Sequence, residues 1–453
     1  MKKVQFRSFI VLIISGVLIF GLIIYLCRYI SQGDSWVSFP VNKHMYTNGV
    51  LTSGEIYDVN GVRLAGMDGD KRVYAEKKAV RVATLHAVGD KSGNISTAAQ
   101  TKFSYLLTDY SLINGAYSLT GRGNSLYLTL DSSLCVTAYD ALDGRNGTVA
   151  LYNYKTGDIL CMVSTPSFDP ANPPKIGDGS GKYVGVYMNR FLSTAYTPGS
   201  VFKLVTSAAA IENIDNLGEW KFKCTGKYTI DGKVITCTEK HGTQDIYASL
   251  ANSCNGAFAK LSQELGAAAI SKYAKRAGLT QPLSFNGIDC ASGSIRTDAS
   301  SADLAWAAIG QDKDLVNPAA MLTFVGGIAN GGVAVKPNLI AEVRTPLGLP
   351  MLRRFRSDGD RMFKKSTADE LAKMMRNNVE ENYGEERFKG MKLCAKSGTA
   401  ELDDGTDHAW FVGFSQREDF PVAFVVVVEH GGSGNSVAGG IAGTVLTKAM
   451  GEL

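Results

Sequence analysis

A serine and a lysine three residues apart are the first candidates for chemistry. Ser200 and Lys203 form the only Ser-x-x-Lys pattern in the chain and lie at the predicted start of an apolar helix over 201–212. A spacing of three puts both side chains on one helical face, so the amine can reach the hydroxyl. Serine needs a base beside it to act as a nucleophile, and a lysine is a base only when burial or a nearby cation removes its proton. The pattern fits covalent catalysis, but taken alone it is common by chance, and a capping serine beside an exposed lysine is the more frequent explanation.

Two short motifs further along the chain carry groups suited to the same chemistry. Ser253-Cys254-Asn255 lies in a helical context, and Lys396-Ser397-Gly398-Thr399 ends an apolar strand. Each motif is common by chance. Their order after the Ser-x-x-Lys pattern, however, is typical of penicillin-binding proteins and related β-lactamases, whose third motif is Lys-Thr-Gly. Ser397 stands in place of that threonine and keeps the hydroxyl.

From about Gly54 to its C-terminus, the chain resembles class B penicillin-binding proteins, the monofunctional peptidoglycan D,D-transpeptidases, and in particular the penicillin-binding protein A-like type. The matching segments are Gly54–Ala65, Ser164–Pro170, Tyr196–Lys203, His241-Gly242, Ile328–Gly332, Lys396–Glu401 and His408–Phe414. Ser53 departs from the family, in which an arginine is usual at that position. The departure concerns the N-terminal region and leaves the three motifs intact.

The resemblance implies a role for each candidate residue. Ser200 is expected to attack the carbonyl between the last two D-alanines of a peptidoglycan stem peptide, with Lys203 accepting its proton. Ser253 and Asn255 are expected to complete the proton route to the leaving amine.

The third motif is expected to bind the substrate. Lys396, Ser397, Gly398 and Thr399 are the implied substrate-binding residues, since a lysine and a hydroxyl suit the terminal carboxylate. The backbone N–H groups of Ser200 and Thr399 are the implied oxyanion hole. β-Lactam antibiotics are expected to imitate D-alanyl-D-alanine and to stall at the acyl-enzyme.

Other functions share this site. A D,D-carboxypeptidase differs only in using water as the acceptor. A β-lactamase adds fast deacylation and is normally a released or lipid-tethered domain, which the predicted anchor argues against. A β-lactam sensor needs several membrane spans. A catalytically idle scaffold of wall synthesis is the non-enzymatic alternative, and the intact motifs argue against it.

Strand-like segments at both ends of the second half of the chain predict how these residues are positioned. Apolar runs over 147–154 and 158–163 resemble those over 393–400, 408–414 and 422–428, and continuous apolar runs suit strands covered on both faces. Helical segments lie between them. We therefore expect an α/β fold in which the first and last strands share one sheet, which the resemblance specifies as the serine transpeptidase/β-lactamase-like fold, a central antiparallel sheet covered by helices.

The N-terminus predicts a membrane anchor. Basic residues at 2, 3 and 7 precede an uncharged apolar run from Ser8 to Cys27, long enough to cross a bilayer as a helix. No small-x-small cleavage site follows it, so we expect an uncleaved, single-pass anchor. Because the basic residues precede the span, the N-terminus is expected in the cytoplasm and the catalytic part outside the bacterial cell membrane.

The composition and pattern suggest three parts: a cytoplasmic N-terminus and anchor over 1–28, a small mixed α+β pedestal domain over 29–145, and a penicillin-binding transpeptidase domain over 146–453. The formal net charge is +4, from 47 basic and 43 acidic residues without a long single-sign block, so no nucleic-acid partner is expected. By resemblance, the expected membrane partner is a polytopic glycan polymerase.

The cysteines and histidines point to neither a cofactor nor a metal. Eight cysteines in 453 residues do not form a disulfide framework. Cys224 and Cys237 flank a predicted hairpin with an Asp231-Gly232 turn, and either a disulfide or two free thiols fits them outside the membrane. Neither His-Glu-x-x-His nor Cys-x-x-Cys occurs, so the sequence predicts no metal site.

Overall fold

A computed structural model describes residues 2–37, 46–47, 50–51, 54–69, 71–108, 122–177, 181–297, 300–353 and 357–452. Ser53 lies outside the described residues.

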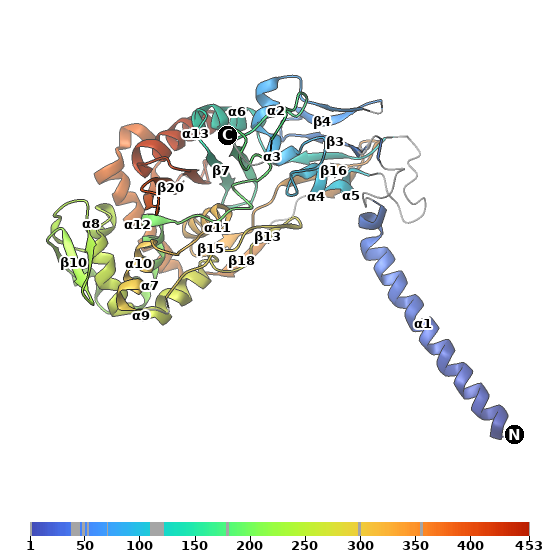
Figure 1. Ribbon diagram of the computed structural model, residues 1–453, viewed down its shortest axis with the longest axis horizontal. Helices are drawn as coiled ribbons and strands as arrows, with labels where there is room; N and C mark the ends of the chain where they lie inside the picture. The colour runs from blue at the N-terminus through green and yellow to red at the C-terminus, as the bar shows by residue number, and fades with distance from the viewer. Residues whose placement is uncertain are drawn as a thin grey trace.

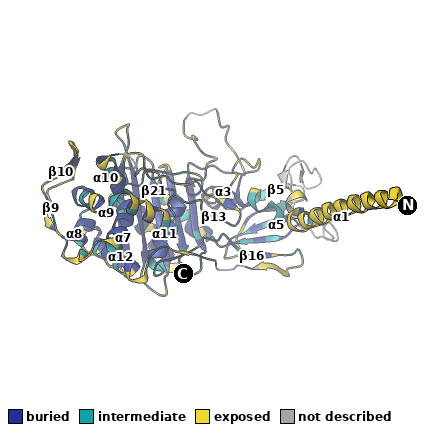
Figure 2. Ribbon diagram, turned by 90° about the horizontal axis from the view of Figure 1, so that it is seen from below, coloured by how far each residue is buried: buried dark blue, intermediate teal, exposed yellow. Residues whose placement is uncertain are grey.

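The chain begins with a long helix, α1 (Lys2–Val37), which contains the predicted span. Among the described residues it is the one helix long and apolar enough to cross a membrane. Its large hydrophobic side chains are exposed, and it extends away from the rest of the molecule (Figures 1 and 2). An apolar helix whose span is not buried within the protein suits a lipid environment.

A six-stranded sheet follows, with the strand order β17-β16-β6-β3-β4-β5. Its strands are β3 (Glu55–Tyr57), β4 (Arg63–Asp68), β5 (Lys71–Tyr74), β6 (Ser125–Leu128), β16 (Ile340–Arg344) and β17 (Pro350–Arg353). β3 pairs with β6 in parallel, and the other pairs are antiparallel. Strands from far apart in the sequence therefore share this sheet. The three-part division stays a prediction. β16 and β17 share this sheet although they lie beyond 145, where the predicted pedestal domain ends.

Short elements complete this region. They are the two-stranded ladder of β1 (Tyr46–Thr47) and β2 (Val50–Leu51), and the helices α2 (Lys78–Ala83), α3 (Leu85–Val88), α4 (Ala99–Lys102) and α5 (Ser104–Leu107).

The second sheet has five antiparallel strands in the order β19-β20-β21-β7-β8. They are β7 (Gly147–Asn153), β8 (Ile159–Thr165), β19 (Leu393–Glu401), β20 (Asp407–Ser415) and β21 (Val422–Val428). Every residue of β21 is buried, as expected for a strand covered on both faces. The prediction that the first and last strands share one sheet is confirmed.

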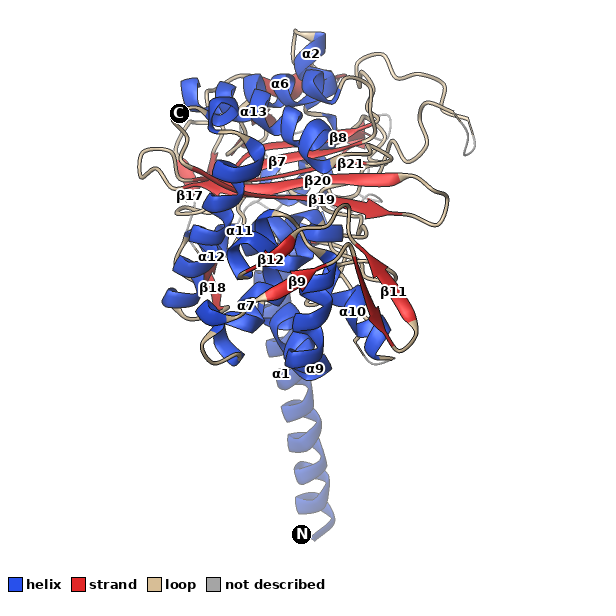
Figure 3. Cartoon of the chain, turned by 90° about the vertical axis from the view of Figure 1, so that its left-hand side faces the viewer, coloured by secondary structure: helices blue, strands red, loops and turns tan. Residues whose placement is uncertain are grey.

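Helices cover both faces of this sheet (Figure 3). On one face lie α6 (Ser132–Leu142) and α13 (Gly439–Glu452); on the other lie α11 (Pro318–Ala329) and α12 (Lys365–Asn378). Behind α11 and α12 pack α7 (Lys203–Asn213), α8 (Ile246–Ala251), α9 (Asn255–Arg276) and α10 (Ser301–Ile309). The predicted α/β fold, a central antiparallel sheet covered by helices, is confirmed.

Small strands join these helices. β9 (Phe222–Cys224) pairs with β12 (Gly242–Gln244), and β10 (Lys227–Ile230) pairs with β11 (Lys233–Thr236) around Asp231 and Gly232, both with positive φ. The predicted hairpin is thus present. Two further short ladders pair β13 (Ser284–Phe285) with β14 (Ile288–Asp289), and β15 (Val333–Val335) with β18 (Asp358–Arg361).

Asn317 is a buried side chain that links the fold to the candidate nucleophile segment. Its Oδ1 caps α11 by accepting from the N–H groups of Ala319 and Ala320. Its Nδ2 donates to the backbone carbonyls of residues 191, 192 and 194, with the carbonyl of Thr194 at 2.7 Å. That segment leads directly to residues 196–200.

We predict that Asn317→Ala lowers the midpoint of thermal unfolding by several degrees. Loss of the cap costs about 1 kcal/mol, and the buried carbonyls left without a donor cost about 1–3 kcal/mol more. Asn317→Asp keeps the cap acceptor but turns a carboxylate oxygen toward three buried carbonyl oxygens, so its midpoint should fall as well. Circular dichroism of the full chain in detergent measures the midpoint, and an unchanged value for Asn317→Ala would contradict the assigned role.

Candidate active site

The candidate nucleophile lies in a short turn that enters α7. Residues Gly199–Phe202 form a 3-10 turn, and Lys203 begins the α-helix. The helix therefore starts slightly later than the predicted 201. The shared face of Ser200 and Lys203 is retained, because residues three apart eclipse in a 3-10 helix.

Backbone and side-chain contacts fix this turn from several sides. Tyr196 exchanges backbone hydrogen bonds with Val316, and Gly199 N donates to the carbonyl of Gly310 at 2.8 Å. The buried indole of Trp410, on β20, donates to the carbonyl of Thr197 at 3.0 Å. The turn is thereby attached to the central sheet.

The amine of Lys203 is the centre of a polar cluster. Its Nζ lies 3.0 Å from Ser200 Oγ, 3.1 Å from Ser253 Oγ, 2.6 Å from the Ser253 carbonyl oxygen and 2.7 Å from Asn255 Oδ1. Its side chain is fully buried. All four residues predicted to be catalytic therefore lie together.

Burial lowers the pKa of Lys203 well below its usual value, and the nearby Lys396 lowers it further. A neutral amine has two N–H donors and one lone pair. The Ser253 carbonyl and Asn255 Oδ1 are pure acceptors and take the two donors. Asn255 Nδ2 donates to the carbonyl of Thr236 at 2.9 Å, which fixes the orientation of this amide. The lone pair of Lys203 is then left for a hydroxyl.

Ser253 lies between the two amines. Its Oγ is 3.1 Å from the Nζ of Lys203 and 3.1 Å from the Nζ of Lys396. It lies between α8 and α9 with φ of +50°, a conformation uncommon for residues other than glycine. Strained backbone of this kind clusters at active sites.

Lys396 enters the cluster from β19. It is fully buried, and its Nζ also donates to the carbonyl of Ser397 at 2.8 Å. Burial lowers the pKa of Lys396 to about 7. Two amines this close cannot both hold a proton without strong repulsion.

The edge of β19 lies directly against the nucleophile turn. Gly199 has φ of +57°, and a Cβ there would lie 2.7 Å from the carbonyl oxygen of Thr399. That oxygen accepts from Gln311 Nε2 on the open side of the strand. An antiparallel ladder directs both backbone groups of a residue to the same side, so the Thr399 N–H faces this edge too.

The remaining residues of the third motif have partners of their own. Ser397 N donates to the hydroxyl of Tyr383 at 2.9 Å, and Ser397 Oγ lies 3.0 Å from the same oxygen. Gly434 N donates to Thr399 Oγ1 at 3.2 Å. Gly398 is buried beneath the Pro198 carbonyl. Sequence reasoning missed Tyr383 and Gly434, because both lie outside the three motifs: Tyr383 is 14 residues before Ser397, and Gly434 is 35 residues after Thr399.

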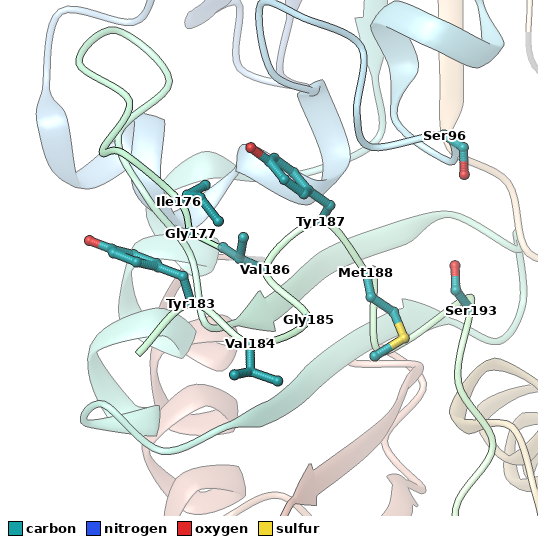
Figure 4. A pocket seen from close by; sticks show the side chains of 10 residues that line it. All are labelled: Ser96, Ile176, Gly177, Tyr183, Val184, Gly185, Val186, Tyr187, Met188 and Ser193. Carbon is teal, nitrogen blue, oxygen red and sulfur yellow. The ribbon is translucent and has the colours of Figure 1, made fainter. Parts of the chain in front are cut away.

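A separate pocket of about 600 Å³ lies beside residues 183–188 (Figure 4). It is lined by Ser96, Ile176, Gly177, Tyr183, Val184, Gly185, Val186, Tyr187, Met188 and Ser193. None of these belongs to the three motifs. The candidate chemistry thus lies outside this pocket.

The sheet is antiparallel and lies between two layers of helices, and the Ser-x-x-Lys turn lies against its edge strand. This combination defines the class of active-site serine acyltransferases. Within that class, the profile of the penicillin binding protein transpeptidase domain matches residues 147–450. The chain therefore belongs to the penicillin-binding protein transpeptidase family.

Named relatives agree with this assignment. The chain is 27% identical over 358 residues to the peptidoglycan D,D-transpeptidase PbpA of Mycobacterium tuberculosis, covering 73% of this chain and 72% of that protein. It is 28% identical over 363 residues to the stage V sporulation protein D of Bacillus subtilis, covering 74% of this chain and 55% of that protein.

Solved structures extend the similarity over most of the chain. The penicillin G acyl-enzyme complex of penicillin-binding protein A from M. tuberculosis matches with a TM-score of 0.77 and 25% identity, covering 88% of this chain and 99% of that one. Penicillin-binding protein 2 of Pseudomonas aeruginosa has the same fold, with a TM-score of 0.72 and 23% identity, covering 88% and 96%.

We predict that Gly199→Ala slows acylation far more than it destabilises the protein as a whole. An alanine at positive φ costs about 1–2 kcal/mol, and its Cβ would also push Thr399 away from Ser200. Gly278→Ala is the matched control, because Gly278 has φ of +77° with open space around its Cβ position. Equal acylation rates in the two variants would show that this contact does not set the site geometry.

The pH dependence of acylation should be bell-shaped. As pH falls, Lys203 becomes protonated and loses the lone pair that accepts the proton of Ser200, so the rate falls. As pH rises through about 7, Lys396 in the free enzyme loses the charge that attracts a carboxylate, so the rate falls again. Second-order rate constants for a fluorescent penicillin, which report the free enzyme, measure both limbs.

The matched variant for this profile is Lys396→Arg. A guanidinium stays protonated, so the alkaline limb should disappear even if the maximum is lower. A wild-type rate constant that keeps rising well above pH 7 would contradict the charge assigned to Lys396.

Proposed function

We propose that the chain is a peptidoglycan D,D-transpeptidase that cross-links stem peptides through an acyl-enzyme on Ser200. The observation that carries the proposal is the 3.0 Å contact between Ser200 Oγ and a buried Lys203, whose pKa is lowered, in a chain of this family.

In the first half-reaction, neutral Lys203 takes the proton of Ser200 as Oγ attacks the carbonyl carbon of the penultimate D-alanine. The resulting oxyanion accepts from the backbone N–H groups of Ser200 and Thr399, an interaction in which one donor is typically worth about 10²–10³ in rate. The intermediate collapses, the C–N bond breaks, and the amine of the terminal D-alanine leaves with a proton relayed through Ser253. An ester on Ser200 remains.

In the second half-reaction, the amine of a neighbouring stem peptide attacks the ester carbonyl. Its proton passes back through Ser253 and Lys203 to Ser200, so the enzyme is regenerated as the cross-link forms. A β-lactam acylates Ser200 by the same first step, but its leaving nitrogen stays attached to the acyl group.

Substrate binding is assigned to the third motif. Protonated Lys396, with Thr399, attracts the terminal carboxylate of the donor stem, while Ser397 and Gly398 provide the adjoining edge. Asn255 contacts both Lys203 and the substrate amide in this scheme. Tyr383 acts as a positioning residue, because it holds both the backbone N–H and the hydroxyl of Ser397.

The proposed topology follows from α1 and from the division of the chain. The anchor, within residues 1–28, crosses the bacterial cell membrane once, with its basic N-terminus in the cytoplasm. The pedestal domain (29–145) and the transpeptidase domain (146–453) then lie outside. Through the anchor and pedestal, the protein is proposed to contact a polytopic glycan polymerase.

Ser200→Ala should abolish covalent labelling of the full chain by a fluorescent penicillin, because it removes the attacking oxygen. Ser271→Ala, at an exposed position on α9, should label like the wild type. Labelled protein is quantified on denaturing gels. Stable label that depends on Ser200 supports the transpeptidase, rapid loss indicates a β-lactamase, and an unlabelled wild type indicates an idle scaffold.

Product analysis with a stem-peptide donor separates the last alternative. With an added acceptor amine, a transpeptidase forms the cross-linked peptide, whereas a D,D-carboxypeptidase releases D-alanine and the shortened stem. Hydrolysis as the sole reaction at every acceptor concentration would overturn the proposed transfer step.

A further inference from the structure

Three cysteines and one histidine from four separate segments converge beside the Ser253-Cys254-Asn255 motif. Cys224 ends β9, Cys237 follows β11, His241 precedes β12, and Cys254 precedes α9. The four ligand atoms all lie within 4.8 Å of one another. Pairing of β9 with β12 places Gly242 opposite Cys224, which brings the histidine to its thiol partner.

Two of the six distances between ligand atoms match those of a tetrahedral metal site. Zn–S bonds of about 2.3 Å and Zn–N bonds of about 2.0 Å put two ligand sulfurs about 3.8 Å apart and a sulfur and a nitrogen about 3.6 Å apart. The Sγ atoms of Cys237 and Cys254 are 3.7 Å apart. Cys224 Sγ is 3.4 Å from His241 Nδ1.

The surroundings suit thiolate ligands and a fixed imidazole. Gly226 N lies 3.4 Å from Cys224 Sγ and Gly256 N lies 3.2 Å from Cys237 Sγ, and each donates to the sulfur, an arrangement that favours the thiolate. The His241 side chain is only 3% exposed, and its Nε2 lies 3.9 Å from Glu239 Oε1. This carboxylate is near the far nitrogen but beyond hydrogen-bond distance; ligating histidines commonly have a carboxylate on that side.

We propose that Cys224, Cys237, His241 and Cys254 bind one Zn²⁺ ion in a closed structural site. A set of three sulfur ligands and one nitrogen ligand selects zinc among common divalent ions. With four protein ligands, no position is open for water, so the ion takes no part in the acyl transfer itself. A disulfide, by contrast, uses two of the sulfurs and leaves the other thiol and the imidazole without a role.

The ion would fix the backbone that carries two proposed catalytic groups. Cys254 lies between Ser253 and Asn255, and Asn255 also binds the carbonyl of Thr236, the neighbour of Cys237. The β9–β12 segment lies at the end of the molecule far from α1 (Figures 1 and 2). Because three of the ligands belong to this segment and Cys254 directly precedes α9, zinc would join the segment to the start of α9.

The sequence predicted no metal site because the four ligands are spread over a long stretch of chain. Only Cys237 and His241 lie close together, and no short-spaced motif marks the others. Pairing of β9 with β12 and the turn before α9 create the site, and neither was evident from local patterns.

Metal analysis of the full chain tests the proposal. Protein purified in detergent, without chelators, should contain about one zinc per chain by inductively coupled plasma mass spectrometry. Cys224→Ser and His241→Ala should each lose most of it. Cys290→Ser, a change at another buried cysteine outside the cluster, should retain it. Zinc content that is absent, or is unchanged in the ligand variants, would overturn the proposal.

Two further measurements guard against variants that fail to fold. Wild-type protein loaded with Co²⁺ should show the thiolate charge-transfer and d–d absorption of a tetrahedral site, and a spectrum without them counts against it. Intact mass after alkylation under denaturing conditions should show all eight cysteines free. A disulfide between any two of the cluster thiols would overturn the proposal.

Removal of zinc by a chelator should slow acylation of Ser200 by about tenfold, with recovery when zinc is restored. This effect rests on the proposed function, whereas zinc content and cobalt absorption do not. Loss of the transpeptidase assignment would leave the metal results intact, and an acylation rate indifferent to zinc removal would overturn only the coupling between the metal and the Ser253 turn.

Discussion

Two lysine amines buried around one serine hydroxyl are the constraint on which this structure depends. Lys203 and Lys396 are each fully buried, and both contact Ser253 Oγ. Burying an ammonium group without a carboxylate partner is costly, and a second cation nearby adds to the cost. The cluster therefore favours at least one neutral amine. The same burial that threatens stability produces the base that a serine nucleophile needs.

The rest of the fold holds this unfavourable arrangement in place. Lys203 belongs to α7 and Lys396 to the edge strand β19, which are far apart in the sequence. The close approach of Gly199 to Thr399 joins these two elements, and Trp410 ties the turn to the next strand. Since β21, almost all of β20 and the first four residues of β19 are buried, the energy of a large apolar core opposes any movement that would separate the amines.

Local signals explain what the sequence could predict. Ser200 and Lys203 lie within one helical turn, and the other two motifs are each contiguous, so their members stay neighbours in any fold that keeps the element. The apolar run over 422–428 likewise indicates a buried strand by itself. Tyr383, Gly434 and the placement of β16 in the first sheet lack such a signal. Each depends on packing between segments far apart in the chain, and hydrophobic periodicity reports only on its own segment.

The three motifs of the site differ in how firmly the central sheet holds them. Ser200 and Lys396 lie on elements attached directly to the central sheet, whereas Ser253 lies on a turn between two helices, in a left-handed conformation. Two contacts hold this turn. Lys203 Nζ donates to the Ser253 carbonyl, and Asn255 Nδ2 donates to the Thr236 carbonyl. A displacement of about 1 Å at a catalytic group can cost about 10² in rate. The segment that contains β9–β12 therefore helps to position the Ser253 turn, although none of its own residues reaches the nucleophile.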